Sequence, residues 1–189
     1  MNKGKLFVIS APSGSGKSTV VSQLLRERQD IKVSISYTTR EPRKGEVDGK
    51  DYYFVSVDQF KKMIDDDGFA EWALVYGQYK GTPRNQIDSA LACGDALILD
   101  VDIQGGLAIR EKYPETVLIF LLPPSFEELK RRLLDRNTDS KKDVEIRLKS
   151  AKDELEFQDR YDYKVINDEV ENAVAKVIAI IDENWTHKR

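Results

Sequence analysis

The most chemically specific segment of the chain runs from Ala11 to Thr19, directly after a short apolar run. Its sequence, APSGSGKST, has the spacing of a phosphate-binding P-loop, with Ala11 where the strict pattern has glycine. Glycines let backbone N–H groups curl around phosphate oxygens, and a following helix adds its positive dipole. A glycine-rich turn without a ligand is the competing interpretation. We expect phosphates to contact Ser13, Gly14, Ser15, Gly16, Lys17, Ser18 and Thr19.

A carboxylate ends the apolar run from Ala96 to Asp100. In P-loop proteins, an acid at a strand end organises Mg²⁺ beside the phosphates, and a P-loop hydroxyl is another ligand. We therefore predict a magnesium ion held by Ser18 and Asp100, with a helix cap as the simpler interpretation of the aspartate. Asp102 falls on the same side of an extended chain, and its own simpler interpretation is a turn residue.

Two arginines, Arg40 and Arg43, lie three residues apart on either side of Pro42. Guanidinium groups form fork-like hydrogen bonds with phosphate, so this pair suits a second phosphate separate from the one in the P-loop. Taken alone, such a pair is more often part of a solvated loop. Together with the P-loop, the pair is a candidate for a second phosphate site in the same chain.

The order of several further segments resembles that of the guanylate kinase family from one end of the chain to the other. These segments are Ser36 to Arg43, Gly45 to Tyr52, Glu71-Trp72, Asp100 to Gly105, and Arg132 to Arg136. The TTRxPR and GExxG patterns within them are far more specific than the P-loop. The resemblance implies transfer of the γ-phosphoryl group of ATP to GMP, giving ADP and GDP, with Mg²⁺ as cofactor.

For GMP, the resemblance implies contacts with the phosphate by Arg40, Arg43 and Tyr52, with the guanine by Ser36, Glu71 and Asp102, and a further contact by Thr82. The chemistry of guanine supports the assignment of Glu71. Guanine presents N1–H and its 2-amino group as adjacent donors, which one carboxylate can accept together, whereas adenine has an acceptor at N1. Without the motif context, Glu71 is simply a surface acid.

For ATP, the resemblance implies that the P-loop binds the phosphates. It places Lys17, Arg136 and Arg147 around the transferred phosphoryl group, and Arg132 and Asn167 near the adenine. A loose phosphoryl-transfer transition state needs alignment and neutralisation of charge more than it needs a strong base. Several cations and no histidine therefore suit the reaction.

Two positions depart from the family pattern. Lys80 stands where the family usually has a tyrosine that touches the GMP phosphate. Its ammonium either replaces the hydroxyl as a donor or the contact is lost, and we carry Lys80 as a candidate GMP ligand. Asn137 stands where a glycine commonly follows the lid arginine, and asparagine tolerates a left-handed backbone less freely.

The elements that must position these residues alternate between strands and helices. Short β-rich runs at Leu6 to Ser10, Ala96 to Asp100, Thr116 to Leu122 and Tyr163 to Ile166 each precede a helical pattern, which predicts an α/β fold with a parallel sheet covered by helices on both faces. Ser125 and Glu128 form a capping-box pattern at the start of a helix. A second helix is expected from Ser140 to about Gln158, and a final one carries Val174 to Trp185 on one stripe.

These elements predict a single guanylate-kinase-like domain of the P-loop NTPase type, with three layers in the order α/β/α. We assign residues 1–32, 89–124 and 159–189 to its core, residues 33–88 to an inserted, mixed β lobe that binds GMP, and residues 125–158 to a helical lid. The polar stretch from Arg136 to Lys142 has the composition of a mobile segment. Closure of the lobes is expected to exclude water, since hydrolysis competes with transfer.

Composition narrows the class of protein further. The chain has 189 residues, a net charge of −3 and 40% hydrophobic residues, which fits a cytosolic globular enzyme and argues against general binding to nucleic acid or membranes. The single cysteine, Cys93, excludes internal disulfides and is expected to be buried. The single histidine, His187, excludes serine and cysteine triads. The number of subunits stays open.

Two alternatives remain at this point. Guanylate-kinase-like domains also occur as scaffold modules that bind phosphorylated peptides and have lost turnover, and such a module should lack a working P-loop. A P-loop kinase that phosphorylates a sugar phosphate would not need Glu71 or Ser36. The presence of Lys17, Ser18 and Asp100 favours a kinase, and Glu71 favours GMP as the acceptor.

Overall fold

A five-stranded parallel sheet forms the centre of the computed structural model, which describes residues 3–75, 77–134 and 141–186, without the side chains of 141–146. Its strands are β1 (Lys5–Ser10), β2 (Ile31–Val33), β7 (Ala96–Asp100), β8 (Val117–Leu122) and β9 (Tyr163–Ile166), in the spatial order β2-β7-β1-β8-β9. The predicted strands are thus confirmed to within one residue. Arg136, Asn137 and His187 lie outside the described residues.

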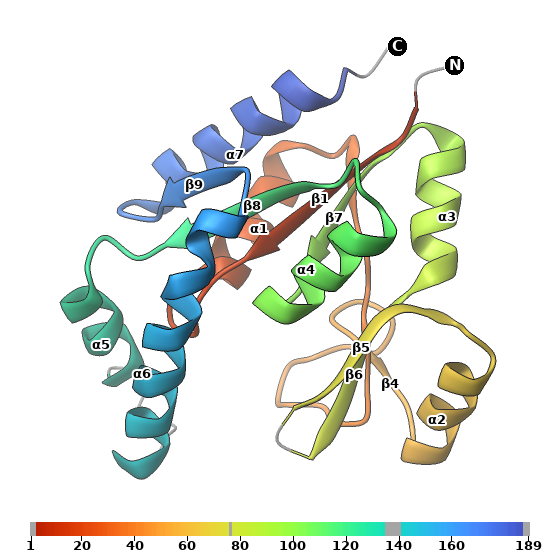
Figure 1. The fold of residues 1–189 in the computed structure, drawn as a ribbon, viewed down its shortest axis with the longest axis horizontal. Helices are drawn as coiled ribbons and strands as arrows, with labels where there is room; N and C mark the ends of the chain where they lie inside the picture. The colour runs from red at the N-terminus through yellow and green to blue at the C-terminus, as the bar shows by residue number, and fades with distance from the viewer. Residues whose placement is uncertain (1–2, 76, 135–140, 187–189) are drawn as a thin grey trace.

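Helices cover both faces of this sheet, so the three-layer α/β/α prediction is confirmed (Figure 1). One face packs against α1 (Lys17–Glu27) and α7 (Val170–Asn184), and the other against α3 (Arg84–Cys93) and α4 (Ile103–Lys112). Alternate residues of β1 serve the two cores: Phe7 packs on one side and Val8 on the other, both with no exposed surface. The stripe from Val174 to Trp185 is buried as expected.

The order of the strands fixes the place of the P-loop. β1 has β7 on one side and β8 on the other, and the chain leaves β1 at its carboxyl end to form the loop. Ile9 pairs with Asp100, so the last residue of β7 lies beside the start of the P-loop. Ligands of open parallel sheets bind at such points, outside the carboxyl ends of the strands.

A second, smaller sheet and the segments that lead into and connect its strands carry all the residues expected to bind GMP except Asp102, which lies at the end of the larger sheet. The four strands of the smaller sheet are β3 (Tyr37–Thr38), β4 (Tyr53–Phe54), β5 (Phe69–Val75) and β6 (Gln78–Pro83), in the order β4-β3-β6-β5, with parallel and antiparallel pairs. Phe60 of α2 (Val57–Asp65) is fully buried between the rings of Phe69 and Tyr79, with centroids 4.4 and 5.2 Å away. Aromatic stacking therefore gives this lobe a core of its own.

The chain passes from the large sheet to the smaller one and later returns, and one side chain joins these two connecting segments. The amide oxygen of Gln86, on α3, accepts the Ser34 hydroxyl at 3.0 Å and the Ile35 N–H at 2.9 Å. Its amide nitrogen donates to the Ile35 carbonyl at 3.3 Å. The segment that enters the smaller sheet is thereby bound to the helix that follows it.

The two helices of the expected lid lie side by side and away from the smaller sheet (Figure 1). α5 (Phe126–Leu134) buries Leu129 and Leu133, while α6 (Lys141–Leu155) continues into a 3₁₀ turn, η1 (Glu156–Arg160). The expected cap is present in one half, since the Glu128 N–H donates to the Ser125 hydroxyl at 3.1 Å. The Glu128 carboxylate instead binds the guanidinium groups of Arg131 and Arg132.

The prediction that Cys93 is buried is wrong, because this side chain is exposed. Ile87 and Ala90 form the buried stripe of α3. A helix turns by about 100° per residue, which places Cys93 roughly 240° around the axis from Ile87 and off that stripe. Strand β2 was not recognised in the sequence, because its three residues are too few to show a period.

No helix within the described part of the chain is long and apolar enough to cross a membrane.

Candidate active site

The P-loop has the backbone that its sequence predicts. Gly14 and Gly16 have φ angles of 92° and 87°, in the left-handed region, and Gly16 is the N-cap of α1. A Cβ at Gly16 would lie 2.5 Å from the amide nitrogen of Asn167, and one at Gly14 would lie 2.9 Å from Leu133. Both glycines are therefore required by conformation and by close packing.

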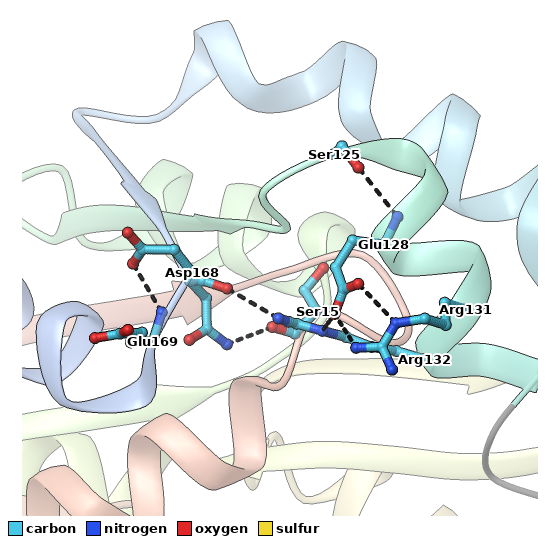
Figure 2. Close-up of polar contacts among 8 residues, drawn as sticks. Ser15, Ser125, Glu128, Arg131, Arg132, Asp168 and Glu169 are labelled. Carbon is cyan, nitrogen blue, oxygen red and sulfur yellow. Dashed lines mark hydrogen bonds and ion pairs between the residues drawn. The ribbon is translucent and has the colours of Figure 1, made fainter.

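Asn167 and Arg132 support the P-loop. Figure 2 shows Ser15 of the loop together with Glu128 and Arg132. The buried amide nitrogen of Asn167 donates to the carbonyl of Ser15 at 2.7 Å. Arg132 donates to the backbone carbonyl of Asn167 at 3.3 Å and to Glu128 at 2.8 Å. The hydrogen bonds from Arg131 and Arg132 lower the pKa of Glu128 to about 2. Of the two residues expected near the adenine, Asn167 thus contacts the P-loop directly and Arg132 contacts Asn167.

Lys17 is held at the carboxyl end of β7. Its ammonium lies 2.7 Å from the Asp100 carboxylate and donates to the Val101 carbonyl at 2.6 Å. The buried hydroxyl of Ser10 contacts the carbonyls of Val101 and Asp102, at 3.2 and 3.1 Å. The expected metal ligand Asp100 therefore lies next to the expected catalytic lysine.

A cleft of about 850 Å³ brings residues of the P-loop, the smaller sheet and α6 together. The predicted site residues that line this cleft are Ser13, Ser18, Arg40, Arg43, Tyr52, Lys80, Asp100 and Arg147. Residues of both expected phosphate sites thus line one cavity, although Arg40 and Arg43 precede Asp100 by 60 and 57 residues in the sequence. This arrangement can hold two phosphorylated molecules with their phosphates facing each other.

Cations gather around Tyr52 on the side of the smaller sheet. The Arg40 guanidinium lies 5.5 Å from the centre of the Tyr52 ring, and the Lys80 ammonium lies 5.6 Å from it. Arg40 also forms two hydrogen bonds with Glu46, at 2.9 and 2.8 Å, which lower the pKa of that carboxyl. Glu46 belongs to the GExxG pattern of the sequence, but that pattern alone does not show that Glu46 binds Arg40.

A second polar cluster lies where β5, β6 and α4 meet. The buried hydroxyl of Thr82 donates to the Glu71 carboxylate at 2.5 Å. Asp102 caps α4 by accepting the Gly105 N–H at 2.8 Å, so the simpler interpretation of this residue also holds. A Cβ at Gly105 would lie 3.0 Å from Glu71 and 3.3 Å from Asp102, which shows that the two carboxylates converge there.

Burial raises the pKa of Glu71, and the charge of Asp102 raises it further, while the bond from Thr82 lowers it. Ser36 lies beside this lobe's strands, where its carbonyl accepts the Tyr53 N–H at 2.9 Å. Glu71, Thr82, Asp102 and Ser36 are not among the residues that line the cleft. Thr19 follows Ser18 in the first turn of α1.

The fold and the two expected phosphate sites are typical of P-loop kinases that act on a second phosphorylated molecule. A family model described as "Guanylate kinase" matches residues 3–184. The chain is 51% identical to a guanylate kinase of Caldanaerobacter subterraneus subsp. tengcongensis, over 95% of this chain and 87% of that protein. It is also 51% identical to one of Clostridium acetobutylicum, over 95% of this chain and 85% of that protein.

A crystal structure of guanylate kinase from Anaplasma phagocytophilum superposes with a TM-score of 0.82 at 34% identity, covering 99% of this chain and 89% of that one. The chain belongs to the guanylate kinase family. The resemblance found in the sequence is thereby confirmed.

We predict that Asn167→Ala loosens the P-loop. The substitution leaves the Ser15 carbonyl without its amide donor, which should cost about 1–3 kcal/mol. For a chain of this size, Tm should fall by roughly 2–12 °C, and the Kd for ATP should rise. Thermal unfolding and titration calorimetry measure the two effects. The control is Asn172→Ala, an exposed asparagine on α7, and equal Tm values for the two variants would contradict the prediction.

Proposed function

We propose that the chain binds ATP at the P-loop and GMP at the smaller sheet, and that the residues assigned above align the two for transfer. As a member of the guanylate kinase family, the protein is an ATP:GMP phosphotransferase of nucleotide metabolism, which forms ADP and GDP. The observation that carries the assignment of residues is the shared cleft, which is lined from both phosphate sites.

On the GMP side, Arg40, Arg43, Tyr52 and Lys80 are proposed to bind the phosphate. Arg40 is already oriented by Glu46 and by the Tyr52 ring, so its guanidinium needs little further ordering when phosphate binds. Arg43 is exposed at the rim of the cleft. A dianionic phosphate exchanges part of the Arg40–Glu46 pairing for stronger charge-assisted hydrogen bonds.

The guanine is proposed to bind at Glu71, with Ser36, Thr82 and Asp102 around it. Thr82 fixes one carboxylate oxygen of Glu71 and thereby orients the plane of the group. An ionised Glu71 then accepts N1–H and the 2-amino group of guanine. Adenine would leave this half-buried carboxylate opposite an acceptor, which penalises AMP.

On the ATP side, the loop from Ser13 to Thr19 is proposed to hold the phosphates through its backbone N–H groups, of which that of Ser13 is bound to Glu154 in this structure. Lys17 and Arg147 are proposed to neutralise the phosphoryl group in transfer. Lys17 is held in place by Asp100 and the Val101 carbonyl. Arg147 faces the same cleft from α6. Arg136, which lies outside the described residues, shares the proposed role, and Arg132 and Asn167 are proposed to support the adenine side.

The donor set at the end of β7 fits magnesium. Ser18 and Asp100 both line the cleft and offer a hydroxyl and a carboxylate, the hard oxygen ligands that Mg²⁺ takes. Among the described residues, no group of three His, Cys, Asp or Glu is placed to hold a metal. A kinase needs only one or two carboxylates, because substrate phosphates complete the shell. When bound, Mg²⁺ neutralises charge on the β- and γ-phosphates.

The division into lobes is part of the same proposal. Residues 1–32, 89–124 and 159–189 serve as core, 33–88 as the GMP-binding lobe and 125–158 as the lid. The two sheets and the α5–α6 pair support this division, except that Val33 belongs to β2 of the large sheet and residues 84–88 belong to α3, which packs on that sheet. We further propose that the partners are ATP and GMP alone, without nucleic acid or membrane, and that the protein acts in the cytoplasm, where ATP is the phosphoryl donor.

The proposed reaction predicts formation of ADP that depends on GMP. A coupled assay with ATP and Mg²⁺ should compare GMP, AMP, CMP, UMP and dTMP as acceptors, and GMP should give by far the highest kcat/KM. Activity with another nucleotide would discard Glu71 as the base reader. Turnover with none of them would instead favour a phosphopeptide-binding module or a sugar-phosphate kinase.

Glu71→Gln should lower kcat/KM for GMP by roughly 10- to 100-fold, since the amide can accept only one of the two guanine donors and the charged bond is lost. The ratio of GMP to AMP activity should fall with it. The matched control is Glu171→Gln, an exposed glutamate in the first turn of α7. An unchanged ratio in the Glu71 variant would remove this residue from the recognition of the base.

The pH dependence of GMP binding tests Lys80. Desolvation of its ammonium, followed by the charges of Arg40 and Lys17, lowers its pKa from 10.5. The charge of Lys80 is lost as the pH rises through this lowered pKa, at a lower pH than for an ordinary lysine. KM for GMP should rise in alkaline solution for the parent, but not over the same range for Lys80→Arg, whose guanidinium stays charged. Identical profiles would show that Lys80 does not contact GMP.

A further inference from the structure

A carboxylate from α6 contacts the P-loop itself. The Oε2 atom of Glu154 accepts the backbone N–H of Ser13 at 3.2 Å, across 141 residues of sequence. Glu154 is half-buried and lines the phosphate cleft. The function proposed above assigns this residue no role, and the sequence alone gives no sign of the contact.

The same face of α6 carries the proposed catalytic arginine. Arg147, Ser150 and Glu154 are spaced by three and four residues, and all of them line the cleft. Beside them, Ala151 is fully buried against Leu129 and Leu133 of α5. Seven residues of helix span about 10.5 Å, so Arg147 lies two turns beyond the point where Glu154 meets the loop.

The surroundings of Glu154 act on its carboxyl group in both directions. Burial and the charges of Asp102 and Asp153 raise its pKa above the ordinary value, while the Ser13 N–H and the charge of Lys17 partly oppose that rise. The contact is made at Ser13, before Gly14 and ahead of the turn that begins α1. Glu154 therefore binds the entrance of the loop.

We propose that Glu154 is a positioning residue, which anchors α6 to the P-loop and thereby sets the place of Arg147 against the ATP phosphates. Because the loop holds the phosphates and Glu154 holds the loop, the distance from Arg147 to the phosphoryl group is fixed through one helix. The hydrogen bond from Ser13 to Glu154 joins the P-loop and α6 directly, so it does not depend on the position of the smaller sheet.

Steady-state kinetics of three variants test this role. Glu154→Ala should lower kcat about tenfold or more, since misplacement of a catalytic group by about 1 Å can cost about 10²-fold, while KM for ATP and GMP changes less than about threefold. Glu154→Gln keeps an acceptor for the Ser13 N–H and should recover kcat to within about threefold of the parent. Glu156→Ala, at an exposed glutamate of η1, is the matched control and should leave kcat unchanged.

A double-mutant cycle with Arg147→Ala separates positioning from a general loss of structure. If Glu154 acts through Arg147, the Glu154→Ala substitution should cost less than about twofold in kcat when Arg147 is already alanine. Losses that multiply would overturn the proposal, as would full activity of Glu154→Ala or a Glu154→Gln variant as impaired as the alanine variant. A strong fall in KM for ATP would also overturn it, because the carboxylate would then be competing with phosphate.

The inference rests on the role proposed for Arg147, and the two can fail separately. Arg147→Ala with parental kcat would refute that role and the positioning of Arg147 together. An impaired Arg147→Ala beside an unimpaired Glu154→Ala would refute the positioning alone. Thermal unfolding of each variant identifies any loss that comes from misfolding, and in that case Glu154→Gln, which preserves the hydrogen bond, decides the outcome.

Discussion

The conformation of the P-loop is the constraint on which the rest of the structure depends. A loop that turns N–H groups toward a ligand leaves few of them for bonds within the loop, such as that from Ser15 to the Pro12 carbonyl, and it needs glycines with positive φ at two positions. Such a backbone is entropically costly, so its surroundings must hold it. Asn167 holds it from the residue after β9, Leu133 packs on it from α5, and Glu154 holds it from α6. Elements far apart in sequence thus converge on one turn.

Two cations of the candidate site already have carboxylate partners within the protein. Lys17 is paired with Asp100, and Arg40 with Glu46. Without these carboxylates, several positive charges in one cleft would repel one another and destabilise the folded state. With them, the cations are oriented in advance. Charge-assisted bonds to phosphate then replace or extend bonds of similar geometry, which keeps the cost of ordering low.

Much of this architecture could be predicted from sequence because its signals are local. The P-loop, the buried strands and the stripe of α7 follow from spacing and from the period of apolar residues. The guanine and phosphate residues came from motif order, since no period marks Glu71 or Arg40. Even there, the structure adds what spacing cannot show, namely that Asp102 caps α4 while facing Glu71.

What could not be predicted depends on contacts between distant segments or on very short elements. The bond from Glu154 to Ser13 joins residues 141 apart, and β2 has only three residues. The exposure of Cys93 turned on its angular position at the end of a helix, which the apolar neighbours Leu91 and Ala92 obscured. Each of these features depends on how distant segments pack in three dimensions, which the order of residues along the chain does not show.

The bonds from Gln86 to Ser34 and Ile35 have a consequence for how such a molecule can diversify. They bring the entry to the smaller sheet against the helix at its exit, so the lobe is inserted into the parallel sheet at a single place. The order of the large sheet does not depend on what lies between those two points. Most of the residues proposed to bind the acceptor can therefore change within this insert while the phosphoryl-donor half stays the same, and Asp102, at the start of α4, is the proposed acceptor residue that stays outside it.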